Sequence, residues 1–494
     1  MKRPMIVAAL GAGIISLISL SFSITVMLYV QALVICLFII SFIALRKREL
    51  AVIFLILTVV AADSYLSVYC KVYKTEELSD ETVDICGTIV SDFYNKENKC
   101  STLYVTKSES DVPSNIKINI YGKNESLNVG DNVHISAEIK TIEKNKSFYY
   151  SKNIFANAFV RKVLSVNKDG NLISAIAGLR SKISKLFVSN LSFDTASTVL
   201  GLTVGDRYLQ SDEYTENVRN SGVSHIMAVS GMHMAVICGA VLKMLKTLRV
   251  PNSLSIVICT SVVLFIMLLC GFTPSILRAG ITYLVFMLSN VVFRVADSKN
   301  TLALSVIIII ILNPFSMGNV SFLLSVSSVT GILTIYPHII ENVIVKHNIK
   351  NKIAVSLINA AAVTLSAYIT TFPVSVWFFE TVSVVSLFTN ILISFAVTVA
   401  LISAFAAMAT NLLIPSGIIS QPFYLVTAVS VKYFNAVINF FGGLQFSTID
   451  VNKYVAESFY FLILAILFVL KYTYFRNKHD KEGVNNADNI GIAA

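Results

Sequence analysis

Two histidines and a serine lie close together in the middle of the chain. His225 and His233 are eight residues apart, and Ser230 lies between them. The apolar run around them predicts one continuous helix, on which both imidazoles share a face about two turns apart. That face can line a hydrated path, or each imidazole can bond to a neighbouring helix. The spacing is too long for two ligands of one metal ion on an unbroken helix, so no metal site is expected.

The serine does not predict hydrolysis. Ser230 and Gly231 lack a complete G-x-S-x-G pattern, and no general base is placed by the sequence. Gly231 instead permits close approach between helices. No P-loop of the form G-x-x-x-x-G-K-[ST] occurs either. We therefore expect no catalytic residue, no cofactor and no ATPase.

Three charged residues lie beside or within apolar segments. Arg278 follows Pro274 by about one turn, and burying an unpaired charge in hydrocarbon is costly, which makes it a functional candidate. The guanidinium can bind phosphate while Pro274 frees backbone groups beside a cavity, or it can extend to the outer headgroups. Asp206 and Arg207 can cap a helix or lie at an outer mouth. Neighbours on a helix do not face each other, so an ion pair between these two is not assumed.

The elements that position these residues are membrane helices. The chain has 494 residues, of which 55% are hydrophobic and 14% charged, and its mean hydropathy is +0.73. Soluble proteins carry about 25% charged residues, so a soluble globular enzyme is excluded. We expect a polytopic α-helical membrane protein with roughly 12 transmembrane or re-entrant helices. The runs cover about residues 5–22, 24–44, 50–66, 224–242, 254–270, 276–293, 301–312, 318–336, 353–378, 383–410, 418–441 and 455–472.

Positive charge predicts the orientation. Arg46, Lys47 and Arg48 lie between the second and third runs, which marks a cytoplasmic loop. Both termini are then cytoplasmic, and residues 67 to about 222 are extracytoplasmic. Later basic clusters alternate accordingly, at Lys243, Lys246, Arg249, Arg294, Lys299, Lys346, Lys350 and Lys352. The run 301–312 is short and can be a re-entrant helix that does not cross the membrane. In that case, the predicted sides of all later loops would be exchanged.

Residues 67–170 differ in composition and predict a small β domain. Strand-like segments lie at Val83–Phe93, Ser101–Thr106, Ile116–Tyr121 and Val133–Ile142. Turn formers separate them, among them Gly130 and Asp131. About five short strands of this kind fit an extracytoplasmic OB-like barrel, a fold that binds oligonucleotides and many other ligands.

A stretch rich in basic and aromatic residues follows these strands. Its candidates for contact with DNA are Lys144, Lys146, Phe148, Tyr149, Tyr150, Lys152, Arg161 and Lys162. Cations for phosphates and aromatic faces for bases suit a single strand of nucleic acid. The same residues can also form a solvated barrel edge, or meet lipid headgroups.

Two smaller features complete the external region. Residues 171–193 predict an amphipathic helix on the membrane surface, with Arg180, Lys182 and Lys185 on its polar face, or an ordinary linker helix. Cys86 and Cys100 flank a predicted hairpin without facing each other directly. Whether they form a disulfide stays open.

Several ordered motifs resemble those of the ComEC family of competence DNA-uptake channels. They are Gly205-Asp206-Arg207, the segment from Ser221 and Gly222 through His225 to Ser230, Gly231 and His233, Pro274 with Leu277-Arg278-Ala279, Asn313-Pro314 with Phe322 to Ser325, Phe378-Phe379, and Leu387 with Thr389-Asn390. The resemblance covers nearly the whole chain. Leu323 replaces the glutamine that many members carry.

The resemblance implies a channel in the cytoplasmic membrane for single-stranded DNA during natural transformation. It also implies a surface DNA receptor, a cytoplasmic helicase-type ATPase and contact with membrane lipids, and it leaves homo-oligomerisation open. Many members end in a metallo-β-lactamase-like nuclease domain with an H-x-H-x-D-H cluster. The six histidines here, at 134, 225, 233, 338, 347 and 479, form no such cluster. We therefore expect that a separate nuclease degrades the strand that is not transported, or that this strand is not degraded.

The expected organisation has five parts. They are N-terminal transmembrane helices (1–66), the OB-like domain (67–170), the surface helix (171–193), the channel domain (194–472) and a polar cytoplasmic tail (473–494). The competing hypothesis is a membrane transporter or assembly platform for a substrate other than DNA. Salt-dependent binding of single strands by residues 67–170 distinguishes the two.

Overall fold

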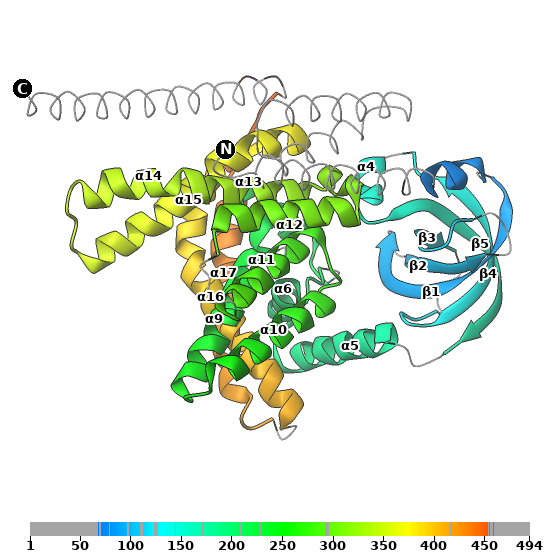
Figure 1. Cartoon of the computed structure of the whole chain (residues 1–494), viewed down its shortest axis with the longest axis horizontal. Coiled ribbons are helices and arrows are strands. Elements are labelled where there is room, and N and C mark those ends of the chain that lie inside the picture. The colour runs from blue at the N-terminus through cyan, green and yellow to red at the C-terminus, as the bar shows by residue number, and fades with distance from the viewer. Residues whose placement is uncertain are drawn as a thin grey trace, which may run out of the picture.

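The computed structural model describes residues 71–452, together with Val68, Tyr454 and Ser458. Short gaps in this range fall at 79, 96–97, 109–111, 123–126, 144, 169–171, 208, 228, 292–295 and 415–416. The spans predicted at 5–22, 24–44, 50–66 and 455–472 lie outside the described residues, as does the predicted tail. A β-barrel lies on one side of the molecule and a group of helices on the other (Figure 1).

The barrel has five strands. They are β1 (Thr82–Asn95), β2 (Asn98–Ser108), β3 (Lys117–Tyr121), β4 (Asn132–Thr141) and β5 (Ile154–Asn167). The closed order is β1-β2-β3-β5-β4, in which β3 and β5 are parallel and the other pairs antiparallel. A closed five-stranded barrel of this kind confirms the predicted OB-like domain.

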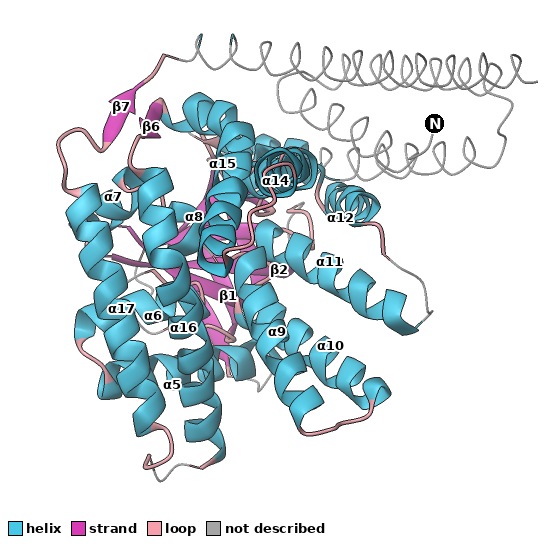
Figure 2. Cartoon of the chain, turned by 90° about the vertical axis from the view of Figure 1, so that its left-hand side faces the viewer, coloured by secondary structure: helices cyan, strands magenta, loops and turns pink. Residues whose placement is uncertain are grey.

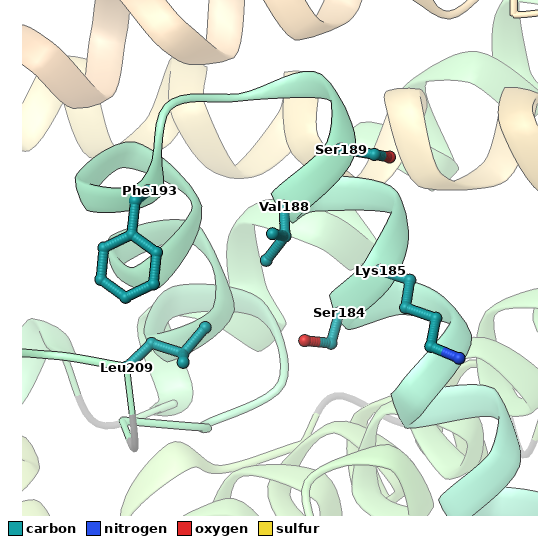
Figure 3. A pocket seen from close by; sticks show the side chains of 6 residues that line it. All are labelled: Ser184, Lys185, Val188, Ser189, Phe193 and Leu209. Atoms are coloured by element: carbon teal, nitrogen blue, oxygen red, sulfur yellow. The ribbon is translucent and has the colours of Figure 1, made fainter.

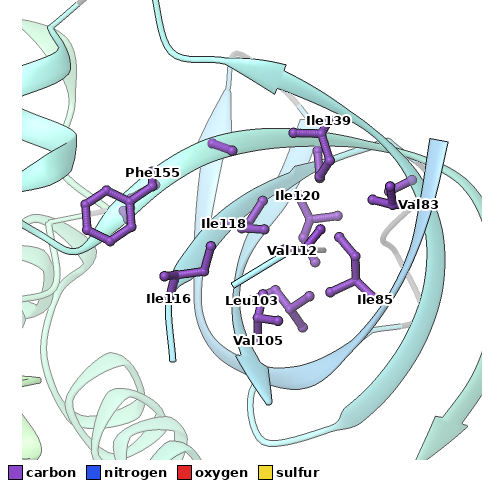
Figure 4. Packing of buried hydrophobic residues seen from close by; sticks show 14 of the residues in the cluster. Val83, Ile85, Leu103, Val105, Val112, Ile116, Ile118, Ile120, Ile139 and Phe155 are labelled. Carbon is purple, nitrogen blue, oxygen red and sulfur yellow. The ribbon is translucent and has the colours of Figure 1, made fainter. Parts of the chain in front are cut away.

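The barrel interior is filled by branched apolar side chains. Ile116, Ile118 and Ile120 are fully buried and lie in one cluster with Leu103 of β2 and Ile85 of β1 (Figure 4). This alternation leaves the intervening residues of β3 on the outer face, because successive strand residues point to opposite sides. The inner face thus stabilises the barrel, while on the outer face of β3 Lys117 and Tyr121 are half-buried and Asn119 is buried.

Two details of the barrel follow from its sequence. Gly130, with φ of +97°, forms the turn before β4, a conformation that favours glycine. The hairpin of β1 and β2 pairs Cys86 with Lys107 but Cys100 with Phe93, so the two cysteines are seven residues apart along β1. No disulfide joins Cys86 to Cys100 in the structure, which answers the open question.

The basic-aromatic stretch does not form one continuous feature. Its first part is a short helix, α4 (Lys146–Tyr150), and its second part is the fifth strand. The sequence of β5 does not alternate between apolar and polar residues, so the pattern did not predict this strand. From Phe159 onward, residues on both of its faces are exposed or half-buried.

The remaining chain is mostly helical. The helices are α5 (Leu172–Asn190), α6 (Phe193–Thr203), α7 (Asp212–Asn220), α8 (Ser224–Met227), α9 (Gly231–Thr247), α10 (Asn252–Leu269), α11 (Pro274–Val291), α12 (Ser298–Leu312), α13 (Val320–Thr334), α14 (Tyr336–Ile340), α15 (Lys352–Phe379), α16 (Ser386–Leu413) and α17 (Gln421–Gly442), with the short helices η1 (Pro314–Gly318) and η2 (Glu341–Val345). A small sheet joins β6 (Thr381–Ser383) to β7 (Thr448–Asp450). Among the described residues, five helical segments are long and apolar enough to cross a membrane: Asn252–Leu269, Val320–Val345, Lys352–Phe379, Ser386–Leu413 and Gln421–Gly442. The protein is therefore a polytopic α-helical membrane protein with a small barrel.

One predicted helix is wrong. The run 224–242 is broken, since α8 ends at Met227 and α9 begins at Gly231. Ser230 has extended backbone angles, φ −133° and ψ 179°, and serves as the N-cap of α9. His225 and His233 therefore do not share one helix face, because a serine cap competes with helix continuation.

The longest helices form the packed centre of the helical part. Figure 2 shows α16 and α17 side by side, with α9 next to α16. Small residues of α16, Ala400, Ala404 and Ala407, are buried in one cluster with Tyr424 and Val431 of α17. Small side chains let helices approach closely, as is common in membrane proteins.

The amphipathic helix predicted before this part is present as α5. It buries Ile183 and Phe187 and leaves Lys182 and Lys185 exposed. The Phe187 ring meets Tyr424 edge-on with centroids 6.1 Å apart. Beside α5 lies an open, mainly apolar pocket of about 480 Å³ lined by Ser184, Lys185, Val188, Ser189, Phe193 and Leu209 (Figure 3).

The barrel core includes one residue from the helical part. Phe315 of η1 is buried in the same cluster as the barrel isoleucines, and its ring lies 5.5 Å from that of Tyr150. The two parts therefore share a hydrophobic core.

Replacing Phe315 by alanine is expected to destabilise the barrel. Removal of a buried phenylalanine side chain leaves a cavity and costs about 3–5 kcal/mol. Phe446→Ala, at a side chain 67% exposed, is the matched control and should change little. Urea-dependent pulse proteolysis of the purified full chain measures both; equal stabilities would contradict a shared core.

Candidate functional site

The outer face of the barrel brings together residues from strands distant in sequence. Register neighbours on β3 and β5 are Asn119 with Asn157, and Tyr121 with Phe159. The rings of Tyr121 and Phe159 stack, with centroids 5.4 Å apart and planes 22° apart. Phe159 is 41% exposed, and Lys140 Nζ lies 5.6 Å from its ring centre. We call this surface, with Lys117, the β3–β5 face.

The segment between β4 and β5 extends this face. Lys152 Nζ lies 4.0 Å from the centre of the Phe148 ring, which is 40% exposed. Tyr149 packs edge-on against Phe148 and is close enough to Tyr121 for their charges to interact. The segment thus adds one cation and two aromatic rings to the stack on β3 and β5.

Two lysines on this surface have perturbed titration. Desolvation by burial lowers the pKa of Lys117, and desolvation together with the nearby charge of Lys117 lowers the pKa of Lys152. None of the ion pairs between described residues involves either amine. An anion bound between them would stabilise both charged forms and raise both pKa values.

The other predicted DNA contacts are partly engaged elsewhere. Lys146 pairs with Glu76 at 3.0 Å, and Arg161 pairs with Glu138. Tyr150 is buried in the barrel core. Lys162 is exposed on β5, and Lys144 lies outside the described residues.

Sequence reasoning missed the residues that β3 contributes to this face. Lys117 and Tyr121 belong to the segment Lys-Ile-Asn-Ile-Tyr, whose isoleucines point into the barrel. That alternation was the available signal, because it already directs the lysine and the tyrosine outward.

Two asparagines bind the segment between β4 and β5 to the helical part. We call residues 146–153, which include α4, the α4 segment. Asn313 Nδ2 donates to the carbonyl oxygens of Tyr150 and Ser151 at 3.1 and 2.9 Å. Asn319 Nδ2 donates to Ser151 Oγ at 3.1 Å. The Oδ1 atoms of the two asparagines accept from the backbone N–H groups of Phe315 and Phe322 respectively. We call Asn313 and Asn319 the asparagine latch.

The helix break places the predicted motif at the start of α9. The backbone N–H of Ser230 donates to Nδ1 of His233 at 3.1 Å, and Ser230 Oγ lies 3.0 Å from the same nitrogen. His233 is fully buried, and its Nε2 has no hydrogen-bond partner among the described residues. His225 is exposed in α8, bonds to the backbone of Gly222, and lies near enough to His233 for their charges to interact.

Arg278 lies beside this helix start. It is 5% exposed, and its Nε donates to Ser325 Oγ of α13 at 2.8 Å. A Cβ added to Gly231 would lie 2.9 Å from Arg278 Nη2, so the glycine allows the guanidinium to approach α9. The structure therefore brings together Gly231, Ser230, His233 and Arg278.

The other motif residues take different positions. Pro274 is the first residue of α11, where its missing N–H costs nothing, so it frees no carbonyl inside a helix. Gly205 has φ of +76°, and the loop it starts carries a half-buried Asp206 and an exposed Arg207. Within the residues that the structure covers, no three or more His, Cys, Asp or Glu side chains form a metal site.

Comparison with known proteins agrees with this architecture. A family model described as "Competence protein" matches residues 202–476, more than half of the chain. The protein named "ComE operon protein 3" of Bacillus subtilis (strain 168) is 26% identical over 246 residues, which is 50% of this chain. The matched part spans only 30% of that relative's length. No solved structure matches the chain.

The fold and site define a class: polytopic helical membrane proteins that carry an OB-like barrel fastened to the membrane part. Within that class, the matched region includes the broken α8–α9 motif, Arg278 and the asparagine latch. The chain belongs to the ComEC family of competence proteins.

Removing Asn313 is expected to loosen the α4 segment. Asn313→Ala removes one donor from each of the carbonyls of Tyr150 and Ser151. The Tyr150 carbonyl keeps the backbone N–H of Asn153, whereas the Ser151 carbonyl loses its donor, at a cost of about 1–3 kcal/mol. Amide exchange of residues 148–153 in the full chain should then accelerate by about tenfold or more. Asn342→Ala removes an exposed amide that bonds to the His338 carbonyl and serves as the control. Unchanged exchange in the Asn313 variant would contradict the latch.

Proposed function

We propose that the protein is a cytoplasmic-membrane channel through which one strand of DNA enters during natural transformation. The observation that carries this is the β3–β5 face, where cations and aromatic rings from separate segments form one surface. Membership of the competence family supports it. In this proposal the barrel faces outward, both termini are cytoplasmic, and the part from 194 to 472 contains the path.

The β3–β5 face fits a single strand rather than a duplex. Bases stack on exposed rings such as Phe159 and Phe148 only when they are unpaired and splayed. Lys117 and Lys152 provide cations beside these rings for the phosphates.

The asparagine latch places this surface next to the helical part. The α4 segment carries Phe148 and Lys152, and the latch bonds the same segment to the helices. A strand held on the β3–β5 face therefore lies next to the helical part. We propose that a helicase-type ATPase pulls the strand, that a surface receptor delivers it, and that a separate nuclease degrades the other strand.

Loss of the two lysines should weaken DNA binding in a salt-dependent way. For the full chain in detergent, Lys117→Gln with Lys152→Gln should lower the slope of log affinity against log salt by about 1.4, since each phosphate contact contributes about 0.7 for a single strand. Lys107→Gln with Lys168→Gln, which removes two exposed barrel lysines, is the charge-matched control. Fluorescence anisotropy with labelled oligothymidylate measures the slopes. Equal slopes in the two double variants would contradict the assignment.

The lowered pKa values predict an early loss of affinity as pH rises. Lys117 and Lys152 lose their protons at lower pH than an ordinary lysine, so single-strand affinity should fall as pH rises over a range that begins below the ordinary lysine pKa of about 10.4. Bound phosphate raises both pKa values, so binding takes up protons in that range. Lys117→Arg with Lys152→Arg keeps the charges and should flatten the profile. Parallel profiles for this variant and the wild type would count against these amines.

Uptake in a naturally competent host tests the channel itself. Deletion should leave labelled DNA bound outside the cell, and the wild-type chain should restore entry. If the amount of DNA inside the cell is the same in the deletion strain as in the wild type, the DNA channel is contradicted and a transporter of another substrate is favoured. Membrane abundance of each chain, measured through an epitope tag, is the control.

A further inference from the structure

The start of α9 has a surplus of positive charge. The first turn of a helix exposes unpaired N–H groups and the positive end of the helix dipole, and α9 has 17 residues. Arg278 places a second positive group there, with Nη2 directed at Gly231. In the described part of the chain, its hydrogen-bond partner is the neutral Ser325, and no ion pair involves it. A buried cation beside a helix start is stabilised by a compensating anion, because an uncompensated buried charge costs free energy.

His233 adds a donor that has no acceptor. Its Nδ1 receives the N–H of Ser230, so in the neutral ring the proton resides on Nε2. Nε2 is buried and has no partner among the described residues. A buried N–H without an acceptor is rare in folded proteins because it forfeits a hydrogen bond to water.

The approach of Arg278 depends on one small residue. At Gly231, any added Cβ would lie 2.9 Å from Arg278 Nη2. Gly231 has no positive φ that would explain a glycine by backbone conformation. The close approach of the Arg278 guanidinium therefore explains why position 231 is a glycine.

We propose that Ser230, Gly231, His233 and Arg278 form a binding site for a phosphate group within the helical part. The N-terminal N–H groups of α9 and the two side chains supply donors and positive charge to the same anion. The phosphate belongs either to a DNA strand in transit, which rests on the proposed function, or to a lipid headgroup. In the first case the site is a contact for the strand beyond the β3–β5 face.

Charge-selective labelling tests the site. Ser230 is half-buried, and the thiol of a Ser230→Cys variant of the full chain in nanodiscs can be modified by negative or positive methanethiosulfonate reagents. Relative to a free thiol in solution, the negative reagent should react faster than the positive one, on the order of tenfold. The chain without this substitution gives the background from native cysteines.

Second substitutions show whether Arg278 sets the preference. Arg278→Gln should bring the two normalised rates close to each other. Gly231→Ala, which displaces the guanidinium but keeps its charge, should reduce the preference in part. Lys246→Gln, at the exposed other end of α9, is the control and should leave it unchanged. Met232→Cys, also half-buried, repeats the measurement if Ser230→Cys does not fold.

Competing phosphates identify the source. If oligothymidylate slows the reaction of the negative reagent with the thiol of the Ser230→Cys variant, the phosphate belongs to the DNA strand. If only phosphatidylglycerol in the nanodisc slows this reaction, the phosphate belongs to lipid. Either result supports the phosphate site. Equal normalised rates for the two reagents, or a full preference in Arg278→Gln, would overturn the proposal. DNA uptake by the deletion strain is measured in a separate experiment. If that experiment contradicts the DNA channel, the labelling result for the phosphate site still stands.

Discussion

The arrangement of the whole protein depends on how the barrel is held to the helices. Two asparagine amides satisfy backbone and hydroxyl oxygens of the α4 segment, while Phe315 completes the barrel core next to Tyr150. Buried carbonyls need donors, so neither part can separate without leaving polar groups unpaired. The apolar and polar contacts therefore reinforce one another at a single junction.

This junction links two positively charged regions. On the barrel side, fixing Tyr150 and Ser151 leaves Phe148 and Lys152 on the surface, next to the stacked rings of β3 and β5. On the helical side, α13 begins at the latch residue Asn319 and carries Ser325, which holds Arg278 toward α9. The first two turns of α13 thus connect the latch to Arg278 and the start of α9.

Sequence reasoning predicted what depends on local pattern. Long apolar runs predicted α10 to α13 and α15 to α17 within a few residues, and alternation predicted the first four strands. It missed the break at Ser230 because the surrounding residues are small or apolar and resemble a helix interior. The pattern of Ser230 and His233 is a capping box in which histidine stands at the place usual for Glu or Gln, so the usual signal was absent. The β3–β5 face was only partly predicted, because parallel pairing of β3 with β5 joins residues about forty positions apart.

In the function proposed above, the latch couples a DNA-binding barrel to a path through the helices. The most direct test replaces Asn313 and Asn319 together by alanine in a competent host and measures labelled DNA bound outside and DNA that has entered. The account predicts that outside binding persists while entry falls strongly, at equal membrane abundance of the variant and wild-type chains. Undiminished entry with the latch removed would contradict it.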